Sequence, residues 1–138
     1  MKDIWEKYAE VLVDYSTKVK KGDLVMIKTT SAQSEDLIKA IYKRVLQKGG
    51  HPLLRTSICD MSDIFIKYAS DEQLDYVDPI VKHEYEIIDK YISIGAPQNL
   101  KSMTRADRKK LIRRAKATRE ISELLLTRSA NGEADWVI

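Results

Sequence analysis

The sequence predicts an α/β fold: a small, mostly parallel sheet of about four strands, flanked by helices in three layers, with a helix coming first. Short apolar, β-branched segments alternate with longer segments whose apolar residues recur every three or four positions. Glycine (5) and proline (3) are scarce, which disfavours a loop-rich, all-β fold. The 138 residues, 43% hydrophobic and 33% charged, fit one globular domain, 1–138.

The first third of the chain predicts a helix, a strand and a second helix. Apolar residues from Ile4 to Val19 recur at helical spacing and predict one apolar stripe, and Gly22 follows as a helix stop. Residues 24–30 are nearly continuous in apolar character, which is typical of a strand covered on both faces in a parallel sheet. Residues 35–48 have one apolar side and are followed by Gly49-Gly50.

The remaining elements repeat this alternation. We expect a strand at 53–58 opened by His51-Pro52, helical segments at 61–68 and 70–88, a strand at 91–95, a helix led in by 102–104 and running to about 125, and a last strand at 135–138. Pro79 either begins a new helical turn or kinks the segment that contains it. Right-handed crossovers then place helices on both faces of the sheet.

Charge is concentrated in one segment. The net charge is −2 over residues 1–100, +8 over residues 101–119 and −3 over residues 120–138. The basic helix 105–119 could face nucleic acid or an acidic partner through a surface made of Arg105, Arg108, Lys109, Lys110, Arg113 and Arg114. The simpler interpretation is a solvated helix face, and the few aromatic residues in the segment argue against a single-strand nucleic-acid binder.

One loop has the position of an anion site. Thr29, Thr30, Ser31 and Ser34 lie between the end of a predicted strand and the start of a predicted helix, where backbone N–H groups could hold an anion or small ligand. Ordinary helix capping in a short turn explains the same residues more simply. No glycine-rich phosphate-binding motif is present in the sequence.

The residues with catalytic chemistry are few and dispersed. His51 and His83 are 32 positions apart, and Cys59 is the only cysteine, so no pair has a metal-ligand spacing. Cys59 follows a predicted strand but has no identifiable base beside it, and a small packed side chain is the simpler interpretation. We therefore expect no catalytic residue, no metal ligand and no cofactor within this chain.

The last apolar segment, Trp136, Val137 and Ile138, predicts a strand at an open sheet edge, where a second copy of the chain could associate. The longest purely apolar runs are four residues, so no segment can span a bilayer, and the acidic, amphipathic start does not resemble a secretory signal. These features predict a cytoplasmic protein without a membrane partner.

Four stretches in order resemble the N-terminal domain of the metallo-aminopeptidase family that includes aminopeptidase T and aminopeptidase S. They are WEKYAEVLVDYSTKVKKGDLVMIKTT (5–30), KGGHPLLR (48–55), YISIGAPQNL (91–100), and the basic helix followed by DWVI (135–138). No single stretch is highly specific; their order along the whole chain carries the resemblance.

The resemblance implies a function that this chain shares only in part. Family members are similar to two-domain enzymes that release N-terminal residues from peptides, with a divalent metal pair (cobalt, zinc or magnesium) held by the larger C-terminal domain, and they form dimers. Since no position here matches the metal-binding motifs, the resemblance implies a scaffold and cavity-wall domain without its catalytic partner. A C-terminal catalytic domain, a peptide substrate and a homodimer are the partners it implies.

Overall fold

The computed structural model describes residues 2–29, 35–95 and 107–138. The elements follow in the order α1 (Lys2–Glu10), the π-helix η1 (Val11–Ser16), β1 (Leu24–Thr29), α2 (Glu35–Gln47), β2 (His51–Thr56), α3 (Met61–Tyr68), α4 (Asp71–Asp75), α5 (Pro79–Ile87), β3 (Lys90–Ile94), α7 (Arg108–Ala130) and β4 (Asp135–Val137). No helix among the described residues has the length and apolar character needed to cross a membrane.

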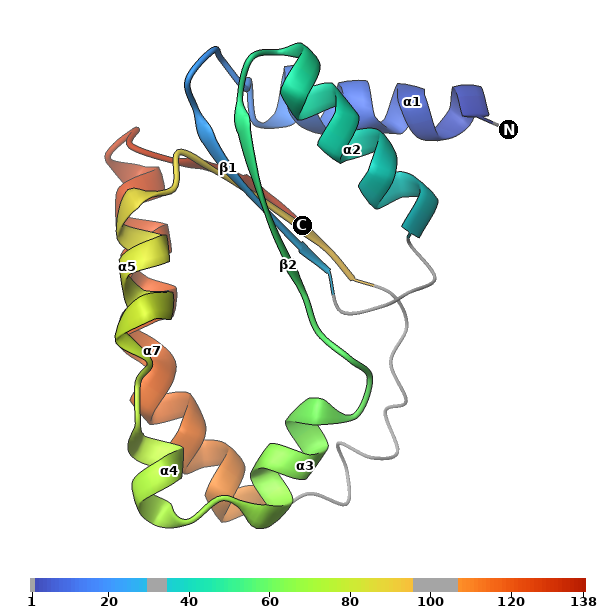
Figure 1. The fold of residues 1–138 in the computed structure, drawn as a ribbon. Helices are drawn as coiled ribbons and strands as arrows, with labels where there is room; N and C mark the ends of the chain where they lie inside the picture. Colours follow the sequence, from blue (N-terminus) through green and yellow to red (C-terminus); the bar gives the residue numbers. More distant parts are fainter. Residues whose placement is uncertain (1, 30–34, 96–106) are drawn as a thin grey trace.

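The four strands form one sheet in the order β2-β1-β3-β4, and every neighbouring pair is parallel. The chain moves from β1 to β2 in one direction across the sheet and then reverses past β1 to β3 and β4. Because parallel crossovers are right-handed, this reversal moves the connecting helices to the opposite face. Figure 1 shows the result: α1 and α2 lie on one side of the sheet, and α5 and α7 on the other. The predicted three-layer α/β fold is confirmed.

Strand alternation supplies both cores. Val25 and Ile27 of β1 and Ile92 of β3 are fully buried against α1, η1 and α2. Met26 and Tyr91, which alternate with them, are buried on the other face against Tyr85 of α5 and the apolar side of α7. A central strand covered on both faces therefore needs a continuous apolar sequence, which residues 24–27 provide.

The expectation of one apolar stripe along the first helix is wrong. Ala9 and Val13 face the core, whereas four other apolar side chains are each at least half exposed: Ile4, Tyr8, Val11 and Tyr15. The helix also does not remain α-helical to its end. The buried Thr17 donates its backbone N–H to the carbonyl of Leu12, and its hydroxyl donates to the same carbonyl at 2.8 Å, which closes the wider π turn.

The predicted helical segment 70–88 is two helices. Ser70 caps α4 through a capping box with Gln73, and α4 ends at Asp75. Asp78 then caps a new helix by accepting a hydrogen bond from the Ile80 N–H, and Pro79 occupies the first turn, where its missing N–H costs nothing. The basic helix begins at Arg108 with Asp107 as its cap and continues to Ala130, beyond the expected end.

A third, smaller cluster lies away from the sheet. Ile66, Ala69 and Leu74 are buried together and pack against Leu111 of α7. Figure 1 shows that α3, α4 and the first turns of α7 form an arm at some distance from the sheet. The arm has its own core, but that core is small, and we define it here as the arm cluster.

An ion pair joins the two helices on one face of the sheet. Arg44 of α2 contacts both carboxylate oxygens of Asp14, with Nε–Oδ1 at 3.0 Å and Nη2–Oδ2 at 2.5 Å, and both side chains are partly buried. The hydrogen bonds from Arg44 lower the pKa of Asp14, while its partial burial acts in the opposite direction. The pair adds a charged contact where α1 and η1 pack against α2.

We predict that this pair makes folding stability depend on pH. A carboxylate with a lowered pKa stabilises the fold above its unfolded pKa of about 3.9, and that contribution is lost as pH falls through the folded value. Asp14→Asn should therefore lower the free energy of unfolding by about 1–2 kcal/mol at neutral pH and by less below about pH 4. Urea titrations across this range measure the difference, with the exposed Glu123→Gln as control; a constant difference at every pH would contradict the assignment.

Candidate functional site

The switch point of the sheet is the first place to look for a ligand site. Strand order reverses between β1 and β3, and in open α/β sheets ligands bind outside the carboxyl ends of the strands at such a point. Thr29 ends β1 opposite Ile94 of β3 and is buried. The predicted loop leaves the sheet here, but Thr30, Ser31 and Ser34 lie outside the described residues.

The basic helix α7 uses three of its cations to cap other helices. Lys110 Nζ donates to the carbonyls of Lys67 and Ala69 at 3.1 and 3.2 Å, at the end of α3. Arg114 Nη1 donates to the carbonyls of Leu74 and Tyr76 at 3.0 and 2.6 Å, at the end of α4. Helix C-termini carry unpaired carbonyls and partial negative charge, so cations there are stabilising.

Arg128 does the same for α5, deeper in the fold. Its Nη1 donates to the carbonyls of Tyr85 and Ile88 at 3.0 and 2.6 Å, and its Nε lies 3.5 Å from Glu133 Oε2. The Arg128 side chain is only 12% exposed. Helix α7 therefore caps α3, α4 and α5, the three helices that connect β2 to β3. The capping cations are Lys110, then Arg114 four residues later, then Arg128 another 14 residues later.

The rest of the predicted basic surface is divided between an ion-pair network and solvent. Arg113 contacts Asp75 through Nε at 2.8 Å and Nη2 at 2.6 Å, and hydrogen bonding to Arg113 lowers the pKa of Asp75. Arg108 and Lys109 are exposed, and Arg105 lies outside the described residues. A groove of about 500 Å³ at this end of α7 is lined by Asp71, Asp107, Lys109, Lys110, Ile112, Arg113 and Lys116.

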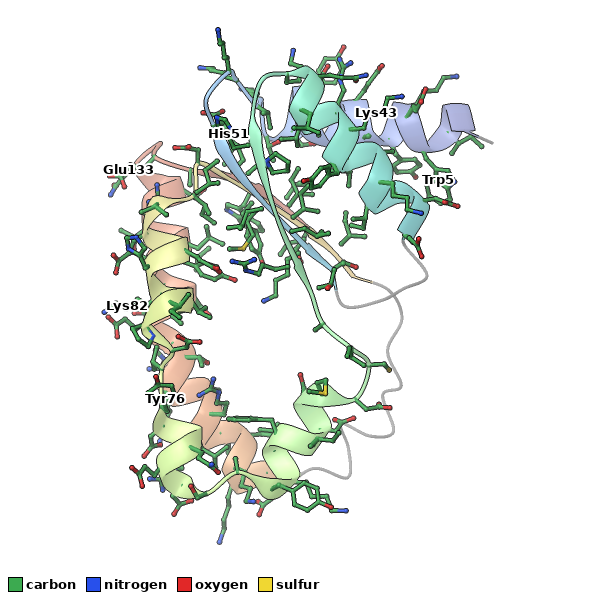
Figure 2. The ribbon with its side chains drawn as sticks, in the orientation of Figure 1. Trp5, Lys43, His51, Tyr76, Lys82 and Glu133 are labelled. Carbon is green, nitrogen blue, oxygen red and sulfur yellow. The ribbon has the colours of Figure 1, made fainter. Side chains whose placement is uncertain are left out.

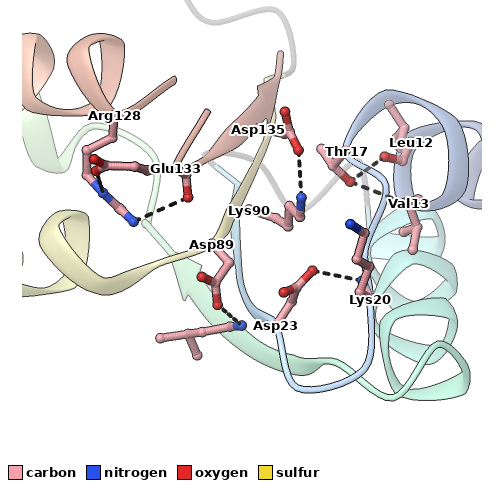
Figure 3. A network of polar contacts seen from close by, with 11 residues as sticks. Leu12, Val13, Thr17, Lys20, Asp23, Asp89, Lys90, Arg128, Glu133 and Asp135 are labelled. Carbon is pink, nitrogen blue, oxygen red and sulfur yellow. Dashed lines mark hydrogen bonds and ion pairs between the residues drawn. The ribbon is translucent and has the colours of Figure 1, made fainter. Parts of the chain in front are cut away.

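A second polar network holds the amino ends of the strands together (Figure 3). Asp89 accepts a hydrogen bond from the Leu24 N–H at 2.8 Å, which fixes the start of β1 beside β3. Lys90, whose side chain is 11% exposed, contacts Asp135 at 2.6 Å and so ties β3 to β4. The ammonium is occupied by a carboxylate of the neighbouring strand, so its role is to fix the register of a three-residue edge strand.

The histidines and the cysteine do not gather into a site. His51 is exposed at the start of β2, His83 lies on α5 with Nδ1 3.8 Å from Glu86, and Cys59 is exposed after β2. Within residues 2–29, 35–95 and 107–138, no three His, Cys, Asp or Glu side chains could hold a metal ion. The donor set of the described part therefore does not fit a metal pair, and we derive no chemical step from one.

Trp136 and Val137 of the predicted association edge lie in β4, and Ile138 follows it. Trp136 is 39% exposed and Ile138 81% exposed, and Val137 packs partly against the α1–α2 core. β4 pairs with β3 on one side and is the outermost strand on the other. The other border of the sheet is β2, which sequence reasoning did not treat as an open edge.

Comparison with known proteins assigns the family. The family model described as thermophilic metalloprotease (M29) matches residues 1–138. Among solved structures, wild-type AmpT from Thermus thermophilus superposes with a TM-score of 0.79 at 15% identity, which shows a shared fold; the match covers 99% of this chain and 35% of that chain. A search among curated proteins finds no match. On the family match over its whole length, the chain belongs to the thermophilic metalloprotease (M29) family.

Proposed function

We propose that residues 1–138 form the non-catalytic, N-terminal part of a metal-dependent aminopeptidase. The observation that carries the proposal is the pair of coverages: the fold matches AmpT over 99% of this chain but only 35% of the AmpT chain. A family member of that length has about two-thirds of its chain in which to place catalytic groups. The described part of this chain offers no cluster of metal-ligating residues.

The arm suggests where this part meets the rest of such an enzyme. Five large apolar side chains on and just before α3 are at least a third exposed: Ile58, Met61, Ile64, Phe65 and Tyr68. Among the residues that the structure describes, the arm cluster has three that are buried. An apolar surface over so small a core is typical of a site that another part of the protein covers. The additional length of the AmpT chain supplies an occupant, so we assign this surface to the catalytic part of the enzyme.

In this proposal the two parts have different tasks. The catalytic part would hold a divalent metal pair (cobalt, zinc or magnesium), which polarises the peptide carbonyl and activates water. The sheet, including the carboxyl ends of β1 and β3 at the switch point, and the arm would supply a rigid wall of the peptide cavity. Rigid scaffolds matter in catalysis because reacting groups must be held in position.

The proposal predicts that the 138-residue chain is inactive by itself. Purified chain should release no N-terminal residue from leucyl and other aminoacyl substrates above background, with or without added cobalt, zinc or magnesium. An active metallo-aminopeptidase assayed in the same buffers is the positive control, and circular dichroism confirms that the tested chain is folded. Metal-dependent turnover that is lost with a chelator and restored with metal would overturn the proposal.

A binding module that uses helix 105–119 is the alternative. Its support is the exposure of Arg108, Lys109 and Lys116 beside the polar groove at the start of α7. Lys110 and Arg114 of this segment are already used as caps and Arg113 is paired with aspartates, which reduces the free charge available to a phosphate backbone. Binding to oligonucleotides or acidic peptides should fall steeply between about 50 and 200 mM salt if this alternative holds; no binding at either salt concentration removes it.

A further inference from the structure

One polar row crosses the sheet near the carboxyl ends of three neighbouring strands. Lys28 of β1 lies opposite Arg55 of β2 and opposite Ser93 of β3, and each is the last residue but one of its strand. Figure 2 marks the amino end of β2 with His51, and the row lies towards the other end of the strands. Because strand order reverses between β1 and β3, Lys28 and Ser93 lie at the switch point, where open α/β sheets bind ligands.

The row lies on the face of the sheet that α5 and α7 cover. Side chains two residues apart in a strand point to the same face, so Lys28 follows Met26 there and Ser93 follows Tyr91. Met26 and Tyr91 are buried against α5 and the apolar side of α7. One step further along the strands, Lys28 and Ser93 are half-buried and Arg55 is exposed. The apolar core of this face therefore ends at the row, and polar side chains begin.

The row carries a positive charge that the described residues do not offset. Lys28 and Arg55 are like charges on strands about 5 Å apart, so they repel each other. Glu84 of α5 offsets Arg55, whose Nε donates to its carboxylate at 2.9 Å. Within the described residues, Lys28 Nζ has no hydrogen bond or ion pair. Residues 30–34 and 96–106 contain no aspartate or glutamate, so these segments offer Lys28 no side-chain carboxylate.

Lys28 and Ser93 are both open to a ligand. The Ser93 hydroxyl also has no partner among the described residues, and no side-chain nitrogen or oxygen there is both buried and unpartnered. Lys28 Nζ and Ser93 Oγ therefore both reach solvent. An ammonium and a hydroxyl on neighbouring strands can donate to the two oxygens of one carboxylate. Because Lys28 is half-buried, water screens such a contact less than it would at an exposed lysine.

We propose that Lys28 and Ser93 form a subsite for a carboxylate of the bound peptide. The inference rests on the proposed function, in which the sheet is a wall of the peptide cavity. An aminopeptidase acts at the amino end of its peptide, so the carboxyl end extends away from the catalytic groups. We expect the C-terminal carboxylate to be the occupant, because every peptide with a free carboxyl end carries it. A subsite at a fixed place on the wall then favours short peptides over long ones.

Binding of small capped peptides to the 138-residue chain tests the subsite without metal or turnover. N-acetyl-alanyl-alanine has a C-terminal carboxylate and no amine, and its C-terminal amide is the uncharged match. In NMR titrations at constant ionic strength, the acid should shift the backbone amide signals of Lys28 and Ser93 saturably, and the amide should bind at least tenfold more weakly. No saturable binding of the acid up to about 50 mM, or equal binding of acid and amide, overturns the proposal.

Three variants assign the binding to the row. Lys28→Met removes the charge and should weaken binding of N-acetyl-alanyl-alanine at least tenfold, and Ser93→Ala should weaken it about threefold. Lys7→Met is the matched control, because Lys7 is an exposed lysine of α1 on the other side of the sheet. Equal losses in the two lysine variants would show general charge attraction and overturn the proposal.

Stability separates a binding role of Lys28 from a structural one. An unpaired cation beside Arg55 stabilises nothing when no ligand is bound, so Lys28→Met should unfold at the same denaturant concentration as the wild type or at a higher one. A variant that unfolds at a lower concentration would assign Lys28 to the fold and overturn the proposal.

A third peptide distinguishes the two sources of the carboxylate. N-acetyl-aspartic acid α-amide carries a side-chain carboxylate and no terminal one. Tighter binding of N-acetyl-alanyl-alanine supports the C-terminal source, and tighter binding of the aspartyl compound supports the subsite with an acidic side chain as its occupant. None of these measurements involves turnover, so a failure of the subsite leaves the proposed function standing. Metal-dependent turnover by the chain would overturn the proposed function without changing these binding results.

Discussion

Replacing Arg128 with methionine should lower the free energy of unfolding by about 2–4 kcal/mol. The largely buried guanidinium donates to the carbonyls of Tyr85 and Ile88 and contacts Glu133. Methionine keeps much of the aliphatic packing but leaves those carbonyls without their cationic donor. Chemical denaturation followed by circular dichroism measures the loss.

Two further variants isolate the capping role of Arg128. Arg128→Lys keeps the charge but offers a single donor atom, so we expect a loss between those of the wild type and methionine. Arg119→Met removes an exposed cation from the same helix and should change stability by less than about 0.5 kcal/mol. If the two methionine variants are equally stable, Arg128 is not a structural cap.

Leu74→Ala should cost about 2–5 kcal/mol in the stability of the arm. Leu74 is fully buried, and with Ile66 and Ala69 it makes up the buried residues of the arm cluster. Shortening its side chain leaves a cavity in a cluster whose other buried residues, within the described part of the chain, are Ile66 and Ala69. Because the arm cluster is separate from the two sheet cores, we expect the arm to open before the sheet does.

Hydrogen exchange with peptide-level resolution distinguishes local from global loss. In Leu74→Ala, peptides from α3 and α4 should exchange faster, while peptides from β1 and β3 keep their protection. Leu126→Ala, on the exposed side of α7, serves as the control. Uniform acceleration across the whole chain would mean that the arm and the sheet unfold as one unit, contrary to this description.

The elements of the sheet could be predicted because their signals are local. A run such as Leu24-Val25-Met26-Ile27 can be buried on both faces only as a central strand, and the structure places it there. Gly49 adopts positive φ just after α2, consistent with its prediction as a helix stop, whereas the first helix already ends at Ser16 and the positive-φ residue after it is Lys18, so the prediction of Gly22 as its stop is wrong. The alternation of strands with helices predicts a parallel sheet, and right-handed crossovers then place helices on both of its faces.

The predictions that failed depended on information outside the local segment. The apolar residues of the first helix divide into two faces because α2 and the sheet cover only Ala9, Val13 and their neighbours. Periodicity alone does not say which of two adjacent stripes is covered. The π turn is closed at buried Thr17, whose hydroxyl donates to the carbonyls of Leu12 and Val13, and apolar periodicity does not reveal such a contact.

The candidate site was the least predictable part. Lys110 and Arg114 belong to the segment interpreted as a solvated basic face, yet they contact carbonyls some 40 residues earlier in the chain, as does Arg128 farther along α7. The spacing of Lys110 and Arg114 puts them on the same side of α7, but only the tertiary arrangement shows that α3 and α4 end opposite them. The open edge of β2 likewise follows from strand order, which local pattern does not give.

Metal binding by the isolated chain tests the central claim most directly, because the proposal assigns every metal ligand to the part of the enzyme outside residues 1–138. Calorimetric titration of the folded chain with cobalt, zinc and magnesium should show no saturable binding of two ions per chain. A crystal structure of the metal-soaked chain in which side chains of this polypeptide alone coordinate a pair of divalent ions would contradict the claim.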